Sequence, residues 1–249
     1  MTLQVIPAID FINERVVRLR QGKFDNIQYF DKSIFEYLDL FYAMKASRVH
    51  LINLESAKDS SKLNYDTLEK ISEYARVPLQ YGGGLKSLDS VQNVSHLFHK
   101  IIISSLLDSD FSSIEDLLRV VSPNKVIAAL DVQITEGNIE KAQFMVQGWT
   151  KPSRHNFWSL LTFLVSLGVS DFIITDISKD GMMAGPNIDL YRTIRAKHLG
   201  INIYASGGVS SLDNLMELDT NDINFAIIGK ALLTESINIK ELEPFLPNA

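Results

Sequence analysis

A glycine-rich turn that follows an apolar run and opens a helix-like pattern occurs twice in this chain. The first copy reads YGGGLKSLD over residues 81–89, and the second reads ASGGVSSLD over residues 205–213. Glycines between a strand and a helix let backbone N–H groups approach an anion without interference from a Cβ atom, and the helix N-terminus adds positive potential. The sequence therefore predicts two phosphate-binding turns.

The repeat extends along the whole chain. A second apolar run follows each glycine turn and ends in small residues, and other strand-like runs also recur in the same order. The paired markers are Asp10 and Asp131, Asn53 and Asp176, Gly83 and Gly207, and Ser104 and Gly229, which lie 121, 123, 124 and 125 positions apart. Four markers at nearly one offset indicate two duplicated halves of four βα units each, approximately residues 1–124 and 125–249.

The expected fold is a single closed TIM (β/α)8 barrel over residues 1–249. Near-continuous apolar strands alternate with amphipathic helices, which is typical of a parallel sheet. Eight such units in 249 residues match the length of a barrel of this kind, about 250 residues. The strands are predicted at residues 5–10, 48–54, 78–81, 100–103, 125–131, 172–176, 201–205 and 224–228.

Two connections are longer than the usual loop of about 2–6 residues. Residues 11–32 are predicted to contain one extra strand at 15–20, and residues 132–155 are predicted to form one long loop. Pro7 has no N–H to donate, so the first strand is expected to be short or irregular.

The composition excludes several classes of function. A net charge of −6 argues against general nucleic-acid binding, and the absence of cysteine excludes disulfides, thiolate metal sites and cysteine nucleophiles. The five histidines show no ligand spacing with carboxylates, so no metal site is expected. No run approaches the roughly 18 apolar residues of a spanning helix, and no export signal is visible. We expect a cytoplasmic monomer that binds a small molecule.

Asp10 and Asp131 are the strongest candidates for chemistry. They end the first and fifth predicted strands, which face each other across a barrel, and active sites of such barrels lie at the C-terminal ends of the strands. Two opposed carboxylates suit general acid–base work on a substrate held between them. Either one alone could simply cap the next turn, but their equivalent positions in the repeat favour catalysis.

Five further residues have both a functional and a structural interpretation. Thr175 and Asp176 end a predicted strand, and Asp180 follows in the next turn, where N-capping is the alternative role. His50 lies among apolar residues, so the pattern favours a buried core histidine. Trp149 could stack on a planar ring or hold its long loop down.

The motifs IPAID, VHLINL, GGGLKS, AALDV, VQGW, TDISKDG, AGPN, ASGGVSSLD and IIGKALL together resemble the HisA family. These are the phosphoribosylformimino-5-aminoimidazole carboxamide ribotide isomerases of histidine biosynthesis. The resemblance runs from about residue 4 to residue 235. It implies a half-barrel duplication with two phosphate sites and an Amadori rearrangement of an aminoaldose to an aminoketose, without cofactor or metal.

The resemblance also implies roles for individual residues on a substrate with two terminal phosphates. Asp131 would be the general acid that protonates the furanose ring oxygen, and Asp10 the base that removes the proton from C2. Trp149 would stack on the aromatic base of the substrate. Positions that contact or orient the substrate are matched by Arg18, His50, Thr175 and Asp176; those of one phosphate site by Gly83, Gly84 and Ser105; and those of the other by Ser206, Gly207, Gly208, Gly229 and Lys230.

The chain departs from the family pattern mostly in its first half. Asn53 stands where the family usually has Asp, Lys86 where it usually has Arg, and Ser104 where it usually has Gly. These changes concern the geometry of the first phosphate site. The alternatives are the sister cyclase of the pathway, which usually has Cys at the position of Ala8, and an isomerase that also acts on phosphoribosylanthranilate. A non-catalytic bisphosphate-binding relative would require the loss of one of the two carboxylates.

Overall fold

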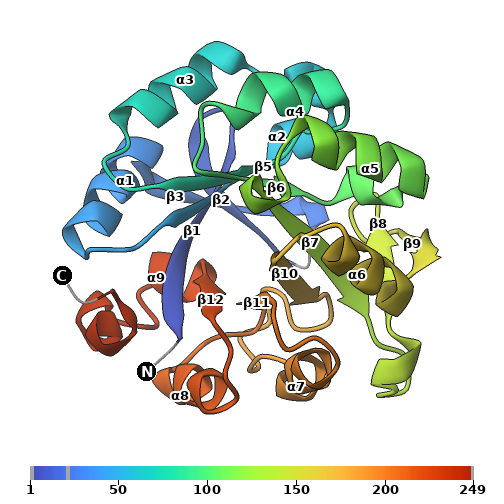
Figure 1. The fold of residues 1–249 in the computed structure, drawn as a ribbon. Coiled ribbons are helices and arrows are strands. Elements are labelled where there is room, and N and C mark those ends of the chain that lie inside the picture. The colour runs from blue at the N-terminus through green and yellow to red at the C-terminus, as the bar shows by residue number, and fades with distance from the viewer. Residues whose placement is uncertain (1–2, 21–22, 248–249) are drawn as a thin grey trace.

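The computed structural model describes residues 3–20 and 23–247, and these residues form a closed parallel barrel surrounded by helices (Figure 1). Pairing of the sixth and fifth barrel strands, β10 with β7, closes the ring. The barrel strands are, in chain order, β1 (Gln4–Ile12), β4 (Val49–Asn53), β5 (Leu79–Gly82), β6 (Lys100–Ile103), β7 (Val126–Gln133), β10 (Asp171–Asp176), β11 (Asn202–Ser206) and β12 (Phe225–Ile228). The predicted fold class is confirmed.

Helices follow the strands and form the outer layer of the molecule (Figure 1). Most begin at a Ser or Asn whose side chain accepts a backbone N–H of the first turn, as Ser33 does before α1. The α-helices are α1 (Ile34–Ala43), α2 (Leu54–Lys58), α3 (Tyr65–Tyr74), α4 (Leu88–Ser95), α5 (Phe111–Val120), α6 (Phe157–Ser166), α7 (Ile188–Lys197), α8 (Leu212–Thr220) and α9 (Lys230–Leu233). The predicted last helix, Ile239–Phe245, is a 3-10 helix.

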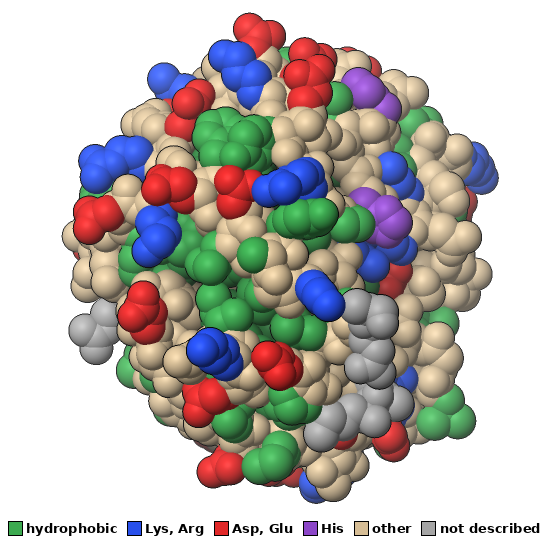
Figure 2. Space-filling model, turned by 90° about the vertical axis from the view of Figure 1, so that its left-hand side faces the viewer, with side chains coloured by type: hydrophobic (Ala, Val, Ile, Leu, Met, Phe, Trp, Pro, Cys, Tyr) green, Lys and Arg blue, Asp and Glu red, His purple; other side chains and the backbone are tan. Residues whose placement is uncertain are grey.

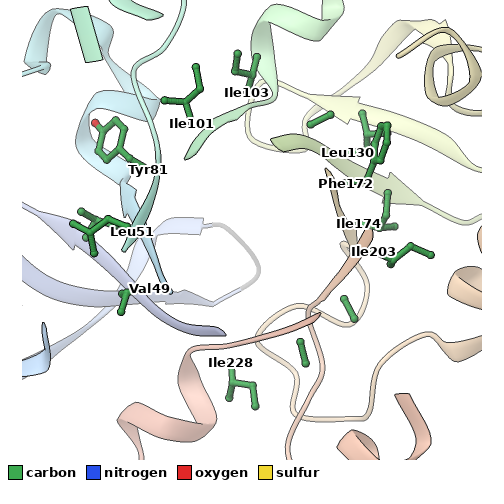
Figure 3. Packing of buried hydrophobic residues seen from close by; sticks show 14 of the residues in the cluster. Val49, Leu51, Tyr81, Ile101, Ile103, Leu130, Phe172, Ile174, Ile203 and Ile228 are labelled. Atoms are coloured by element: carbon green, nitrogen blue, oxygen red, sulfur yellow. The ribbon is translucent and has the colours of Figure 1, made fainter. Parts of the chain in front are cut away.

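Alternation along each barrel strand separates two hydrophobic clusters. Val49, Leu51 and Tyr81 belong to the larger cluster, which fills the space between the strands and the helices (Figure 3). Ile6, Ile127 and other residues one position away along the strands form a smaller cluster inside the barrel. Because successive side chains of a strand point to opposite faces, the residues two positions beyond this inner cluster also face the interior.

Both long connections contain antiparallel strands that the sequence did not fully indicate. β2 (Arg15–Arg20) matches the extra predicted strand, but β3 (Lys23–Ser33) pairs with it where a loop was expected. The prediction of a long loop over residues 132–155 was wrong, because β8 (Gln143–Val146) pairs with both β7 and β9 (Lys151–Asn156). Most described residues of β3 and β9 are exposed, so these strands lack the alternation of apolar and polar residues that identifies a half-buried strand.

The expectation for Pro7 was also wrong, since β1 is nine residues long and lies between two neighbours. Its register explains why. Residues 4–7 of β1 pair with β12, and residues 8–11 pair with β4. Pro7 is the last residue of the first ladder, so its missing N–H falls where the pairing changes from one neighbour to the other.

The described helices include none that is both long and apolar enough to span a membrane. On the face shown in Figure 2, acidic and basic side chains are interspersed, with hydrophobic side chains between them.

Candidate active site

Asp10 and Asp131 lie on opposite sides of the barrel near the C-terminal ends of their strands. β1 and β7 are separated by three strands in each direction around the ring. Asp10 follows the inward-facing Ala8 by two positions, and Asp131 follows the inward-facing Ala129 by two. Both carboxylates therefore face the barrel interior at its mouth.

The β2–β3 hairpin brings a cation to Asp10. Arg18 donates one short hydrogen bond from Nη1 to Asp10 Oδ2 and another from Nη2 to the carbonyl oxygen of Ala8, at 2.9 Å. Both charged side chains are only 15% exposed. Burial raises the pKa of Asp10, and the Arg18 charge and hydrogen bond oppose that rise. The pair is a buried carboxylate with its own counter-ion.

The β8–β9 hairpin brings a neutral donor to Asp131. Trp149, at the turn of this hairpin, donates from Nε1 to Asp131 Oδ2 at 2.9 Å. Burial raises the pKa of Asp131, while hydrogen bonds from Trp149 and from Thr175, its neighbour on β10, oppose the rise. Residues 147–149 all have positive φ, at 54°, 65° and 68°, so the turn that presents the indole is tightly folded.

Asp180 is a third carboxylate at the mouth, and the sequence left it open between a functional and a capping role. It lies in the loop after β10 and is half-buried. Burial raises the pKa of Asp180 to about 6; Arg18 opposes this rise, and the negative charges of Asp10 and Asp131 add to it. The position of Asp180 in the TDISKDG motif was the available signal, but turn capping was an equally good explanation of it.

The glycines of both turns are required by backbone geometry. Gly83 and Gly208 have φ values of 107° and 87°, a region that L-residues rarely occupy. A Cβ on Gly83 would lie 2.2 Å from the carbonyl oxygen of Asn53, and one on Gly208 would lie 2.2 Å from that of Gly185. Each turn is thus pressed against the loop that follows the preceding barrel strand.

Ser104 and Gly229 have similar backbones but different surroundings. Their φ and ψ angles are −127° and −65° for Ser104, and −112° and −79° for Gly229, so neither position needs glycine for its conformation. A Cβ on Gly229, however, would lie 1.4 Å from Nη2 of Arg18. The guanidinium of Arg18 therefore packs directly on the turn at Gly229, after β12. This contact excludes a side chain at position 229.

A cavity of about 310 Å³ opens beside the turn after β12, where Lys230 follows Gly229. Arg18 and Lys230 both line it, together with Gly181 and residues of the β2–β3 hairpin. Lys230 Nζ also donates to the carbonyl oxygen of Gly181 at 2.9 Å. Two cations and a nearby glycine turn make this cavity suitable for an anion.

The remaining predicted site residues have different surroundings. Asp176 is buried and both of its oxygens are used within its own loop, one by Ser178 and the other by Asn187 at 2.6 Å. Its equivalent, Asn53, likewise caps α2. Other predicted residues lie at strand ends or turns: Ser206 ends β11, Gly84 and Gly207 lie in the glycine turns with positive φ, Ser105 begins a 3-10 helix after β6, and His50 is buried within β4.

The fold and this mouth define a (β/α)8 barrel in which two glycine turns flank opposed carboxylates. Such a combination suits acid–base chemistry on a phosphorylated small molecule. The chain belongs to the histidine biosynthesis protein family, whose sequence model matches residues 4–238. The predicted family is confirmed.

Three similar proteins match nearly the whole chain. A relative from Buchnera aphidicola (subsp. Acyrthosiphon pisum, strain Tuc7) is 32% identical over 238 residues, which are 95% of this chain and 96% of the relative. Relatives from Pseudoalteromonas translucida and Bacillus cereus (strain B4264) are each 32% identical, over 95% and 96% of this chain and 97% of each relative. All three are named 1-(5-phosphoribosyl)-5-((5-phosphoribosylamino)methylideneamino) imidazole-4-carboxamide isomerase.

Proposed function

We propose that this protein is the isomerase of histidine biosynthesis that converts the aminoaldose of its substrate into an aminoketose by an Amadori rearrangement. The observation that carries the proposal is the pair Asp10 and Asp131, opposed across the mouth and held by unlike partners. The name of the relatives contains two phosphoribosyl groups, which agrees with a substrate that carries a phosphate at each end.

The two glycine turns support binding of such a substrate by its two ends. They follow β5 and β11, which are the third and seventh strands of the barrel and therefore lie opposite each other. A molecule that spans them crosses the line between Asp10 and Asp131. We assign Gly83, Gly84 and Ser105 to one phosphate, and Ser206, Gly207, Gly208, Gly229 and Lys230 to the other.

The chemistry requires the opening of one C–O bond and a series of proton transfers. A general acid protonates the ring oxygen of the aminoaldose, the bond from C1 to that oxygen breaks, and the nitrogen lone pair forms a protonated imine. A general base then removes the proton from C2, which gives an enol. Tautomerisation of the enol produces the ketone at C2 and the amine at C1.

The unlike partners of the two carboxylates support the assignment of roles. Arg18 favours the ionised form of Asp10, which a base needs. Burial raises the pKa of Asp131, and only hydrogen-bond donors oppose that rise, so no cation favours its ionised form. Asp10 is accordingly the base and Asp131 the acid.

Asp180 is a second candidate for the acid, and its pKa of about 6 is the observation that favours it. A carboxyl group with that pKa still carries a proton in an appreciable fraction of molecules near neutral pH. Comparison of Asp131→Asn with Asp180→Asn separates the two. The acid is the residue whose replacement abolishes the falling high-pH limb of kcat.

Turnover of the isomerase substrate by purified protein, followed by mass spectrometry and NMR of the product, tests the proposal. Formation of the aminoketose supports it, and an unchanged substrate would contradict it. A cyclase would instead require ammonia and release an imidazole product, and a binding relative would retain the substrate unchanged. A separate assay with phosphoribosylanthranilate tests the second isomerase activity. The expectation of a cytoplasmic monomer stays a prediction.

A further inference from the structure

His50 is held by one hydrogen bond inside the barrel. It is 9% exposed, and its Nδ1 lies 2.9 Å from Nε2 of Gln80, its register neighbour on β5. Burial, followed by the nearby charge of Arg18, lowers the pKa of His50 to about 3. The ring is therefore neutral at physiological pH and carries one proton on one of its two nitrogens.

The orientation of the Gln80 amide decides which nitrogen carries that proton. Arg48 Nη1 approaches Gln80 Oε1 at 3.4 Å. A guanidinium can only donate, so the amide must turn its oxygen toward Arg48 and its NH2 group toward His50. The NH2 group can only donate in turn. Nδ1 of His50 is then an acceptor without a proton, and the proton lies on Nε2.

Arg48 is itself fixed by a polar cluster within the barrel. Its Nη1 donates to the hydroxyl of Tyr204 at 2.8 Å, and that hydroxyl donates to Asp171 at 3.2 Å. Asp171 is buried and also accepts from Lys100, at 2.6 Å, and from Asn202, at 3.0 Å. Because Arg48 is anchored in this way, the amide of Gln80 has one favourable orientation.

We propose that Gln80 is a positioning residue that keeps the proton of His50 on Nε2, so that His50 presents a neutral N–H donor to an oxygen of the substrate. Nε2 of His50 has no hydrogen-bond partner within residues 3–20 and 23–247. The ring is the register neighbour of Ala8, whose carbonyl oxygen accepts from Arg18. The open donor thus lies beside the Arg18–Asp10 pair, where the proposed isomerase holds its sugar. The donor role rests on that proposed function, whereas the position of the proton does not.

Gln80→Glu is the decisive variant, because it exchanges the donor beside Nδ1 for an acceptor of nearly the same shape. The new carboxylate accepts from Arg48 and from a protonated Nδ1. The ring then has an Nε2–H only while it is doubly protonated. Two cations lie near the His50 ring. Arg18 on β2 pairs with Asp10 of β1, and Arg48 contacts the side chain of residue 80 from the side opposite His50. None of these changes in the variant.

The position of the proton is measured without substrate, by long-range ¹H–¹⁵N NMR of the histidines. The wild-type protein should show His50 with a protonated Nε2 and no titration between pH 5 and 8, and Gln80→Glu should show a protonated Nδ1. A protonated Nδ1 in the wild-type protein would overturn the proposal. His50→Gln assigns the resonances.

Activity then tests the donor role. In Gln80→Glu, kcat should fall by about tenfold or more as pH rises through the His50 ionisation that NMR measures in the same variant, while wild-type kcat stays level there. Gln80→Met, which leaves Nδ1 without a fixed partner, should lose less. Ile102→Val is the control for a loosened barrel interior and should keep wild-type kcat.

Two outcomes would overturn the donor role. One is an unchanged kcat in Gln80→Glu after Nδ1 has become protonated and Nε2 has lost its proton. The other is an equal loss in Ile102→Val, which would attribute the effect to packing. If the wild-type protein does not turn over the substrate at all, the proposed isomerase and the donor role both fall, and the NMR result still decides the position of the proton.

Discussion

The two halves of the barrel present the same carboxylate in two different settings. In each half, the first barrel strand carries the Asp and is followed by an antiparallel hairpin, β2–β3 after β1 and β8–β9 after β7. The first hairpin supplies Arg18 to Asp10, and the second supplies Trp149 to Asp131. One partner is a cation and the other is a neutral N–H.

This difference agrees with the two opposite proton transfers of the proposed mechanism. Burial raises the pKa of both carboxyl groups. Only Asp10 has a cation that counteracts burial by its charge, and a charge acts on the ionised form more strongly than a neutral donor does. In the proposed mechanism, equivalent positions thus supply an acid and a base through a change of the hairpin side chain.

The β2–β3 hairpin also accounts for a difference between the turns after β6 and β12, which contain Ser104 and Gly229. Ser104 and Gly229 have nearly the same backbone conformation, but only Gly229 is covered by Arg18. The serine in the first half is therefore compatible with the fold. Glycine in the second half makes room for a cation beside the turn.

The largest expected effect is the loss of either carboxylate. Asp10→Asn and Asp131→Asn keep the shape of the side chain and remove proton transfer, so each should lower kcat by about 10²–10⁴-fold with KM little changed. Steady-state kinetics and a thermal melt of each variant measure this. The double variant should lose less than the product of the two factors, because both residues act in one reaction sequence. A single variant that keeps a tenth or more of wild-type kcat would remove that residue from the mechanism.

A matched pair of substitutions tests the role of Arg18 at the turn that contains Gly229. Gly229→Ala places a methyl group where the guanidinium lies, so it should displace Arg18 and raise KM for the bisphosphate by about tenfold or more. Ser104→Ala, at the equivalent position, should change KM by less than about threefold. Equal effects of the two substitutions on KM would contradict a special role of the second half. A crystal structure of Gly229→Ala shows whether Arg18 has moved.

Trp149 should show a smaller effect that divides into two parts. Trp149→Phe keeps an aromatic ring and removes the hydrogen bond to Asp131, so it should cost about 0.5–1.5 kcal/mol in kcat/KM. Trp149→Ala would also remove the expected stacking on the aromatic base of the substrate and should cost about 1–3 kcal/mol. Thermal stability per variant separates catalysis from folding. Intact activity together with a strongly lowered melting temperature would show that the indole stabilises the fold and has no role in catalysis.

Asp180 should give the smallest effect, and it concerns stability. Its pKa of about 6 exceeds that of an unfolded Asp, so the folded state binds more protons than the unfolded state between about pH 4 and 6. The free energy of unfolding therefore decreases as pH rises through that range. Asp180→Asn removes this loss and, because the side chain is half-buried, should be about 1 kcal/mol more stable than wild type at pH 7. Urea titrations at pH 4 and pH 7 measure the difference, which should vanish at pH 4; the same difference at both pH values would contradict the shifted pKa.

The sequence by itself determined the barrel, the repeat and the two opposed carboxylates. Apolar runs such as residues 126–130, glycines that must adopt positive φ, such as Gly83 and Gly208, and Asp10 and Asp131 at equivalent positions are local features. Each is visible because burial and backbone conformation limit which residues a single position accepts. The hairpin strands β3 and β9 were missed for the complementary reason, since exposed strands impose little restriction on their residues.

Only the tertiary structure decided which side chain meets which carboxylate. Arg18 and Trp149 lie 8 and 18 residues after their partners, and Asp180 approaches Asp10 from the other half of the chain. The glycine at position 229 likewise depends on Arg18, which is more than 200 residues away in sequence. The sequence pattern indicates which residues are buried and where the backbone turns. The pKa of a carboxyl group depends instead on the charges and hydrogen-bond donors within a few ångströms of it. Only folding brings these groups together.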